Sequence, residues 1–411
     1  MNKKIAVIGG GAAGLMAAGE AAKLGSDVTL FEKNEKLGKK LAITGKGRCN
    51  VTNLCNINEF LSNVATNPKF LYSALNYFNP QDCVDFFENL GVKLKVERGK
   101  RVFPVSDNAF DIVDALKKFT NTNKVKIKFE KVRELLINNG KINGLVASNA
   151  KYDFDSVIIC TGGISYPGTG SDGDGYKFAK QAGHNIIDLK PSLVPVEIKE
   201  KFCADLMGLS LKNIKLYVYE NDKKIFEEMG EMIFTHFGVS GPLVLSASSH
   251  IRNTENKNYK ISLDLKPALS EEQLDKRILS DFEKYKNKMF KNSLDDLLPK
   301  KLIPVFISIL ENYINPEKKI NEITKTERAE LVELFKNFGM TFKKFRPVDE
   351  AIITCGGVDT KEIMSNKMES KIVVGLYFAG EIIDVDAYTG GFNLQIAFAT
   401  GKLAGKNASE S

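Results

Sequence analysis

The feature that most constrains this chain is a glycine-rich turn between a short apolar segment and an alanine-rich segment near the N-terminus. Residues 5–8 form an aliphatic run that is typical of a buried parallel strand. Gly9, Gly11 and Gly14 then give the pattern G-x-G-x-x-G, and residues 12–24 predict a helix. A strand that leads through such a turn into a helix predicts the first βα unit of a dinucleotide-binding domain.

Each glycine of this turn has its own physical role. Gly9 permits the tight turn, and Gly11 lets backbone N–H groups approach a pyrophosphate. Gly14 allows the helix to pack closely on the strand, and the helix N-terminus carries partial positive charge that favours phosphates. A second predicted strand, residues 27–31, ends in Glu32. The Glu32 carboxylate is therefore expected to accept hydrogen bonds from the adenosine ribose hydroxyls.

Two distant segments indicate FAD rather than NAD. Residues 156–159 predict another buried strand, which ends in the turn Thr161-Gly162-Gly163. Near the C-terminus, residues 375–381 predict a strand, and a helix is expected from about residue 394 to residue 403. A chain that returns to its nucleotide fold at the C-terminus resembles the flavoproteins with two dinucleotide-binding domains.

That resemblance has consequences for the last strand and helix, which face the ribityl chain and the isoalloxazine ring in those flavoproteins. It implies that Glu381 binds a ribityl hydroxyl. It also implies that the amides around Gly391, Phe392 and Asn393, at a helix N-terminus, stabilise negative charge on the reduced ring.

A second G-x-G-x-x-G, formed by Gly168, Gly170 and Gly173, is not interpreted as an NAD site. No strand runs directly into it, and Pro167 precedes it. Asp172 and Asp174 would repel a pyrophosphate. We therefore expect no resident NAD(P) domain, and NADH or NADPH is expected to reduce the flavin in a transient encounter.

A longer stretch carries a specific family resemblance. Residues 38–53 read Gly-Lys-Lys-Leu-Ala-Ile-Thr-Gly-Lys-Gly-Arg-Cys-Asn-Val-Thr-Asn. Further segments agree in order along the chain: residues 101–104, 162–167, 234–242, 354–358, 368–371 and 379–393. The chain resembles the HI0933-like, or aminoacetone-oxidase-like, family of bacterial FAD-binding flavoproteins across its whole length.

The family resemblance implies a three-part α/β layout. A Rossmann-type FAD-binding domain would comprise residues 1–190 and 345–411. An inserted β-rich domain fits residues 191–265, and a helical subdomain fits residues 266–344, where Ser270 is a suitable helix N-cap. The inserted part is expected to cover the flavin and select the substrate. The alternative is that it only shields the flavin from water, with its lysines solvated.

The residues expected to contact the cofactor come from these motifs. They are Gly9, Gly11, Ala12, Ala13, Gly14, Glu32, Lys33, Lys40, Gly45, Gly47, Arg48, Cys49, Asn50, Thr161, Gly162, Gly163, Gly380, Glu381, Gly391, Phe392 and Asn393. Lys40, Lys46 and Arg48 are candidates to neutralise the pyrophosphate or to hold an anionic substrate, against the alternative of solvated loop charge. Cys49 has no resolving partner, so a buried structural thiol is favoured over a redox role.

Three residues are candidates for catalysis: His236, Arg48 and Tyr388. His236 is the one histidine inside a family motif, and its alternatives, a proton donor near the flavin or a packed side chain before a turn, are evenly balanced. Tyr388 lies on a glycine-rich loop, where it is a candidate acid or substrate platform, with aromatic packing as the alternative.

The chemistry implied by the family is hydride or electron transfer at the flavin. Members include amino-ketone oxidases, reducers of conjugated enones in bile-acid chemistry, and a reductase that forms dihydrouridine in large-subunit ribosomal RNA. The leading hypothesis is reduction of a ribosomal uridine, in keeping with a net charge of +7. A small-molecule enone reductase or amine oxidase is the second hypothesis, and a flavoprotein that binds RNA or a partner without turnover is the third.

Composition limits the remaining possibilities. Six cysteines without a C-x-x-C pair and only three histidines argue against a zinc site and a disulfide framework, which favours the cytoplasm. No run of eighteen apolar residues occurs, so no transmembrane helix is expected. No flavin-attachment motif is evident, and FAD is therefore expected to bind non-covalently. The oligomeric state is left open.

Overall fold

The computed structural model describes residues 2–148, 150–252 and 254–410. The chain forms two compact units, and the polypeptide leaves and re-enters the first one. The first unit comprises Met1–Ser192 and Pro347–Ser411, and the second comprises Leu193–Arg346. The sequence therefore folds as one domain with another inserted into it.

A seven-stranded sheet forms the centre of the first unit, and its parallel strands carry the predicted nucleotide motif. The strand order is β19 (Ile363–Met364), β20 (Glu369–Ser370), β21 (Leu376–Phe378), β10 (Ser156–Ile159), β1 (Lys4–Ile8), β2 (Asp27–Phe31) and β6 (Lys126–Lys128). β1 pairs in parallel with both β10 and β2, and β10 pairs in parallel with β21. Segments from both ends of the chain thus meet in one sheet.

Helices cover this sheet and smaller sheets extend it. The helices of the first unit are α1 (Ala12–Lys23), α2 (Lys39–Ile43), α3 (Ile57–Ser62), α4 (Tyr72–Tyr77), α5 (Pro80–Asn89), α6 (Ala109–Thr122), α7 (Asp174–Gln181) and α13 (Phe392–Glu410). The smaller sheets are β3 (Thr52–Asn53) with β5 (Arg101–Pro104) and β4 (Leu94–Glu97), β7 (Val132–Asn138) with β8 (Lys141–Ala147) and β9 (Ala150–Asp153), and β11 (Ile186–Ser192) with β18 (Ile353–Val358).

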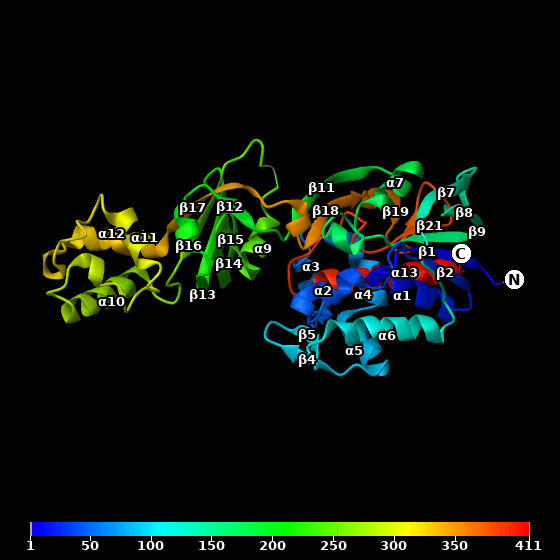
Figure 1. Ribbon diagram of the computed structural model, residues 1–411, viewed down its shortest axis with the longest axis horizontal. Helices are drawn as coiled ribbons and strands as arrows, with labels where there is room; N and C mark the ends of the chain where they lie inside the picture. Colours follow the sequence, from blue (N-terminus) through cyan, green and yellow to red (C-terminus); the bar gives the residue numbers. More distant parts are fainter. Residues whose placement is uncertain (1, 149, 253, 411) are drawn as a thin grey trace. The chain divides into compact units, whose positions relative to one another are not determined.

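The two terminal helices pack closely on one another, as Figure 1 shows for α1 and α13. A Cβ atom at Gly401 or Gly405 would lie 2.4 Å from the carbonyl oxygen of Ala13 or Ala17, respectively. Only glycine fits such an approach of one helix backbone to another. The helix expected at residues 394–403 starts earlier and continues to Glu410, which lengthens this contact.

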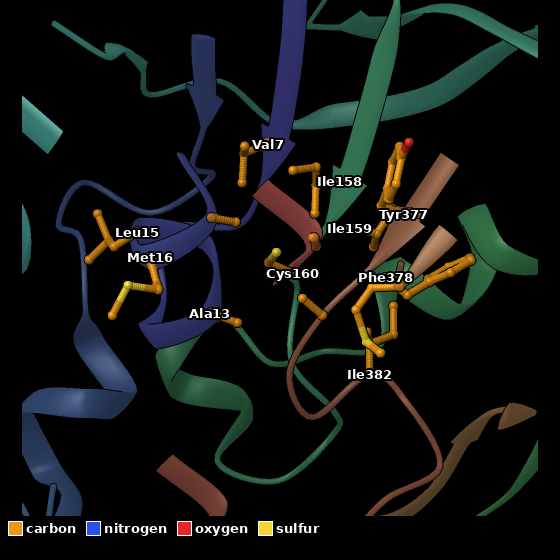
Figure 2. Packing of buried hydrophobic residues seen from close by; sticks show 14 of the residues in the cluster. Val7, Ala13, Leu15, Met16, Ile158, Ile159, Cys160, Tyr377, Phe378 and Ile382 are labelled. Carbon is orange, nitrogen blue, oxygen red and sulfur yellow. The ribbon is translucent and has the colours of Figure 1, made fainter. Parts of the chain in front are cut away.

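The core between sheet and helices is continuous and apolar. Val7, Ile158 and Phe378, from three adjacent parallel strands, are fully buried. Figure 2 shows these side chains in one buried cluster that also includes Ala13 and Met16 of α1. Strands buried on both faces read as unbroken apolar runs, which explains why the sequence pattern identified them.

The second unit is a closed β-barrel joined to a group of helices. The barrel order is β12 (Val196–Ile198), β15 (Gly238–Ser240), β14 (Lys223–Thr235), β13 (Ser210–Glu220), β16 (Tyr259–Asp264) and β17 (Phe338–Phe345). Its helices are α8 (Phe202–Asp205), α9 (Pro242–Ser248), α10 (Glu271–Lys284), α11 (Ile303–Leu310) and α12 (Lys325–Lys336). Ser270 caps α10 as expected, through a capping box with Gln273.

The prediction that residues 266–344 are helical is wrong for the last part of that range. Phe338, Met340 and Phe342 are buried at alternate positions, which is the period of a strand, and β17 pairs with β16 and β12. Phe306 of α11 stacks on Phe338 at 5.5 Å, so the helices and the barrel share one core. Helices α10, α11 and α12 are inserted in the chain between the barrel strands β16 and β17.

Candidate functional site

The three glycines of the turn between β1 and α1 have different roles. A Cβ atom would lie 2.5 Å from the carbonyl oxygen of Cys160 if placed at Gly9, and 1.8 Å from that of Gly9 if placed at Gly14. At Gly11 a Cβ atom would meet no atom within 4 Å. Gly9 and Gly14 are therefore required by the fold itself, whereas Gly11 leaves open space at the N-terminus of α1.

Glu32 lies at the end of β2 and is buried against this turn. Its Oε2 atom accepts a hydrogen bond of 2.8 Å from the backbone N–H of Gly10. Its Oε1 atom accepts bonds from the backbone N–H and the side-chain amide of Asn34, at 2.8 and 2.7 Å. These bonds fix an acidic group beside the glycine turn, where the motif requires one.

Three segments far apart in the sequence meet around Glu381. The Nζ atom of Lys40, in α2, lies 2.6 Å from Glu381 Oε2 and 2.7 Å from the hydroxyl of Ser165. Glu381 Oε1 accepts hydrogen bonds of 2.8 Å from the Ser165 hydroxyl and from the backbone N–H of Thr354. Lys40 therefore offsets the charge of Glu381, and the network holds this carboxylate in one orientation.

The loop after α2 has an unusual backbone. Gly45, Lys46, Gly47 and Cys49 all have positive φ angles, between 57° and 83°. Such angles are costly for Lys46 and Cys49, and strained residues of this kind cluster at functional sites. Burial raises the pKa of the Cys49 thiol to about 12, which makes a reactive thiolate at neutral pH unfavourable. The geometry agrees with a structural thiol.

Arg48, in the same loop, does not present an unpaired charge. Its Nε atom donates a hydrogen bond of 2.9 Å to Asp107, and its guanidinium also binds Glu97. The guanidinium carbon lies 4.3 Å from the centre of the Phe103 ring. Two carboxylates and an aromatic face thus hold Arg48, so an anion would have to compete with them.

The N-terminus of α13 is fixed to the preceding loop by Asn393. The side-chain oxygen of Asn393 accepts a hydrogen bond of 3.0 Å from the Ala387 N–H, and its amide donates one of 2.7 Å to the Ala387 carbonyl. Tyr388, half-buried, donates its backbone N–H to the carbonyl of Asn63 at 3.0 Å. The side chain of Asn393 thus shapes the loop, and Phe392 is buried against Phe60.

Several buried polar atoms in this unit lack a partner among the described residues, and they test whether a dinucleotide fits. Asn50 Oδ1, Thr161 Oγ1 and the hydroxyl of Tyr176 each have no hydrogen-bond partner there. Buried polar groups in proteins are nearly always hydrogen-bonded, to protein, water or ligand. Together with the open space at Gly11, these groups fit a bound FAD.

Other expected site residues lie elsewhere. Lys33 points to Asp172 and Asp174 and forms ion pairs with both. His236 lies in the second unit, exposed in the turn between β14 and β15, with its ring 5.0 Å from that of Phe237. The glycine turn, Thr161 and Glu381 follow the carboxyl ends of the adjacent parallel strands β1, β10 and β21, whereas His236 belongs to a separate unit.

Three residues at the site, Ser165, Thr354 and Tyr176, were not predicted from the sequence. Ser165 and Thr354 bind Glu381, and both lie within family-like segments, which could have indicated them. Tyr176 lies in α7, where its spacing resembles that of an ordinary core residue. In the described parts of the chain, no group of histidine, cysteine and acidic side chains could hold a metal, and no helix is long and apolar enough to cross a membrane.

Comparisons with known proteins agree with this geometry. Residues 3–407 match the model of the HI0933-like protein Rossmann domain. The chain is 33% identical over 414 residues to a 3-dehydro-bile acid delta(4,6)-reductase of Clostridium scindens, covering 100% of both chains. It is 34% identical over 401 residues to a ribosomal RNA dihydrouridine synthase of Haemophilus influenzae, covering 96% of this chain and 95% of the relative.

Solved structures extend the agreement to the fold. A flavocytochrome c3 fumarate reductase superposes with a TM-score of 0.53 at 16% identity, covering 100% of this chain and 78% of that one. A 3-ketosteroid-delta4-(5alpha)-dehydrogenase from Rhodococcus jostii superposes with a TM-score of 0.52 at 14% identity, covering 100% and 97%. The predicted fold class, family and cofactor are thereby confirmed: the chain belongs to the HI0933-like family and is an FAD-dependent oxidoreductase.

Proposed function

We propose that this oxidoreductase reduces a C=C bond conjugated to a carbonyl, and that its substrate is a uridine of large-subunit ribosomal RNA. The observation that carries the proposal is full-length similarity to relatives with two different substrates and one type of reaction. A 3-dehydro-Δ4,6 compound carries its double bonds in conjugation with a ketone. Dihydrouridine forms when the uracil C5=C6 bond, conjugated to the C4 carbonyl, is reduced.

The residues of the first unit have distinct tasks in this proposal. When bound, FAD would provide the hydride chemistry, and the protein would provide binding, orientation and electrostatics. The amides at the N-terminus of α1 would hold the pyrophosphate, and Glu32 would hold the adenosine ribose. Glu381, oriented by Lys40 and Ser165, would bind the ribityl chain. The N-terminus of α13 would favour negative charge on the ring.

NADH or NADPH is proposed as the reductant, in a transient encounter. The second glycine pattern has a carboxylate, Asp174, at the start of its helix, where a resident nicotinamide dinucleotide would place a phosphate. Flavin reduction should therefore saturate weakly with nicotinamide concentration. Tight stoichiometric binding of NADPH to the oxidised enzyme, measured by calorimetry, would contradict this part of the proposal.

The proton that completes the reduction requires an acid, and His236 is our first candidate. His236→Ala should leave the flavin spectrum unchanged and slow substrate-dependent flavin reoxidation by about 100-fold, the usual effect of losing an acid catalyst. Tyr388→Phe is the matched test of the second candidate. If both variants turn over normally, the proton comes from another group, and the substrate site must be sought around Arg48, which Arg48→Gln tests as a substrate contact and not as an acid.

The substrate is tested by mapping dihydrouridine in ribosomal RNA from a deletion strain. The wild-type gene should restore one modified position, and a Gly11→Val gene, expected to encode protein without flavin, should not. Restored modification would also be consistent with action in the cytoplasm, where ribosomes are assembled. An unchanged map, together with flavin reoxidation by a 3-keto-Δ4 steroid, would favour the small-molecule alternative. Salt-dependent RNA binding without any reoxidation would favour a flavoprotein that binds RNA without turnover.

A further inference from the structure

The barrel of the second unit carries an irregularity that gathers positive charge. In the pairing of β12 with β17, Glu197 lies opposite Lys344, whereas Ile198 lies opposite Phe342, so Lys343 is an extra residue in its strand. This is a β-bulge, which re-aims side chains at a strand edge. In a regular strand Lys343 and Lys344 would point to opposite faces. Here their Nζ atoms lie 3.8 and 3.6 Å from the same carboxylate, that of Glu197.

A third cation, Arg346, completes this group. Its Nη1 atom donates a hydrogen bond of 3.0 Å to Glu197 Oε1. Its guanidinium carbon lies 4.5 Å from the centre of the Phe237 ring, in the turn after β14. Glu197 lies opposite Gly238 of β15, which brings this turn to the same place. We name Glu197, Lys343, Lys344 and Arg346 the bulge cluster.

The two lysines of the bulge cluster are exposed, whereas the carboxylate that they share is buried. The Glu197 side chain is 10% exposed, whereas those of Lys343 and Lys344 are 57% and 64% exposed. Both exposed lysines therefore share one buried carboxylate, which also binds Arg346. Elsewhere in this unit two cations share one carboxylate, as Arg277 and Lys284 do at Asp281. Lys215 and Lys224 likewise share Glu227. Solvent-exposed lysines with excess charge attract anions.

We propose that the bulge cluster binds backbone phosphates of the RNA substrate, an inference that rests on the function proposed above. A phosphodiester chain carries repeated single charges, and lysine and arginine are the residues that neutralise them in protein–RNA contacts. The lysines reach outward on flexible side chains, and Arg346 is held by Phe237. Phosphate contacts of this kind position an RNA without reading its sequence.

The test compares two double variants of the full-length flavoprotein. Lys343→Gln with Lys344→Gln removes two charges of the cluster. Lys276→Gln with Lys325→Gln removes two exposed lysines of α10 and α12 outside it. Affinity for a transcript of large-subunit ribosomal RNA is measured by filter binding over a range of salt concentrations. The cluster variant should bind about 10-fold more weakly and lower the slope of log K against log salt by about 1.4.

The control variant should retain wild-type affinity for RNA, and both variants should keep the flavin spectrum and the rate of reduction by NADPH. If the cluster variant binds RNA with the wild-type affinity and salt slope, the bulge cluster is not the RNA contact. If polyglutamate of matched charge competes as well as RNA does, the surface is a general anion site and the assignment to RNA fails. Because binding is read directly, these results stand whether or not the wild-type enzyme proves to reduce uridine.

Discussion

Two regions of the first unit carry the same glycine pattern and use it in opposite ways. At the first, Gly9, Gly11 and Gly14 join β1 to α1, and no acidic residue lies in the first turn of that helix. At the second, Gly173 precedes α7, whose first residue is the buried Asp174. A helix N-terminus attracts negative charge from a ligand or from a side chain.

The surroundings of Asp174 show that the second site is already occupied by the protein's own charge. Lys131 and Lys177 lie 2.9 and 3.1 Å from its carboxylate, and Lys33 lies 3.3 Å away. The loop before it is tied to the end of β2, because the Asn34 amide donates to the carbonyl of Thr169 at 3.1 Å. We infer that the glycine pattern alone does not make a phosphate site, and that the open N-terminus of α1, without an acid in its first turn, fits one.

The largest effect should come from filling the closest contact of the first turn. Gly14→Ala would place a methyl group 1.8 Å from the carbonyl oxygen of Gly9, so strand and helix must separate. We expect a loss of about 3 kcal/mol or more in the free energy of unfolding, measured by thermal or urea denaturation. Gly168→Ala in the second loop meets no atom within 4 Å and should be neutral. Equal stability of Gly14→Ala and Gly168→Ala would contradict the claim that the fold requires glycine in the first turn and not at position 168.

The next effect separates binding from folding. Gly11→Val should fold, because the side chain enters open space and Gly11 has an ordinary φ of −85°. The valine should block the approach of the pyrophosphate and weaken FAD binding by at least about 100-fold, or about 2.7 kcal/mol. Flavin content after dialysis and the melting temperature of the apoprotein are the measurements. A yellow, fully loaded variant would show that the pyrophosphate lies elsewhere.

A smaller effect is expected from changing Asp174, whose carboxylate lies at the N-terminus of α7, where a bound dinucleotide would place a phosphate. Burial alone would raise the pKa of Asp174, but hydrogen bonds from Lys131 and Lys177 and the charge of Lys33 outweigh it and hold the pKa well below 3.8. A carboxylate whose pKa is lower in the folded than in the unfolded chain stabilises the fold at pH values above its pKa in the unfolded chain. This contribution is lost as the pH falls below about 4. Asp174→Asn should cost about 2 kcal/mol at pH 7.

The pH dependence provides the control for that variant. The difference in unfolding free energy between the wild type and Asp174→Asn should be constant from pH 7 to about pH 5 and shrink at lower pH. Asp172→Asn, on the more exposed neighbouring carboxylate, should have a smaller effect. A difference that grows on acidification would mean that the paired lysines do not stabilise the charged form of Asp174.

The smallest effect concerns the buried hydroxyls of Thr161 and Tyr176, which have no hydrogen-bond partner among the described residues. In the apoprotein, Thr161→Val and Tyr176→Phe should be neutral or slightly stabilising, because each removes a buried group that lacks a hydrogen bond. In the holoprotein each should weaken FAD binding by about 1 kcal/mol, or about 5-fold, if the cofactor is the missing partner. Equal FAD affinity in wild type and variants would assign these hydroxyls to water instead.

The sequence predicted the nucleotide fold well because its signals are local. The run of residues 5–8, the glycine turn and the strand ending at Glu32 follow one another within a single βαβ unit. The capping box at Ser270 is equally local, since both of its partners lie within four residues. The strand at 338–345 was missed because its partners, β12 and β16, lie far away in the sequence, and a short alternating pattern beside helices is ambiguous.

What the sequence alone determined is that this chain builds a dinucleotide-binding domain and closes it with its own C-terminal segment. Only the tertiary structure decided how the charged residues of the motifs are used. Lys40 became the partner of Glu381, 341 residues away, and Arg48 became the partner of Glu97 and Asp107. The physical reason is that backbone conformation follows from neighbouring residues, whereas the partner of a long charged side chain depends on which distant segments the fold brings within hydrogen-bond distance.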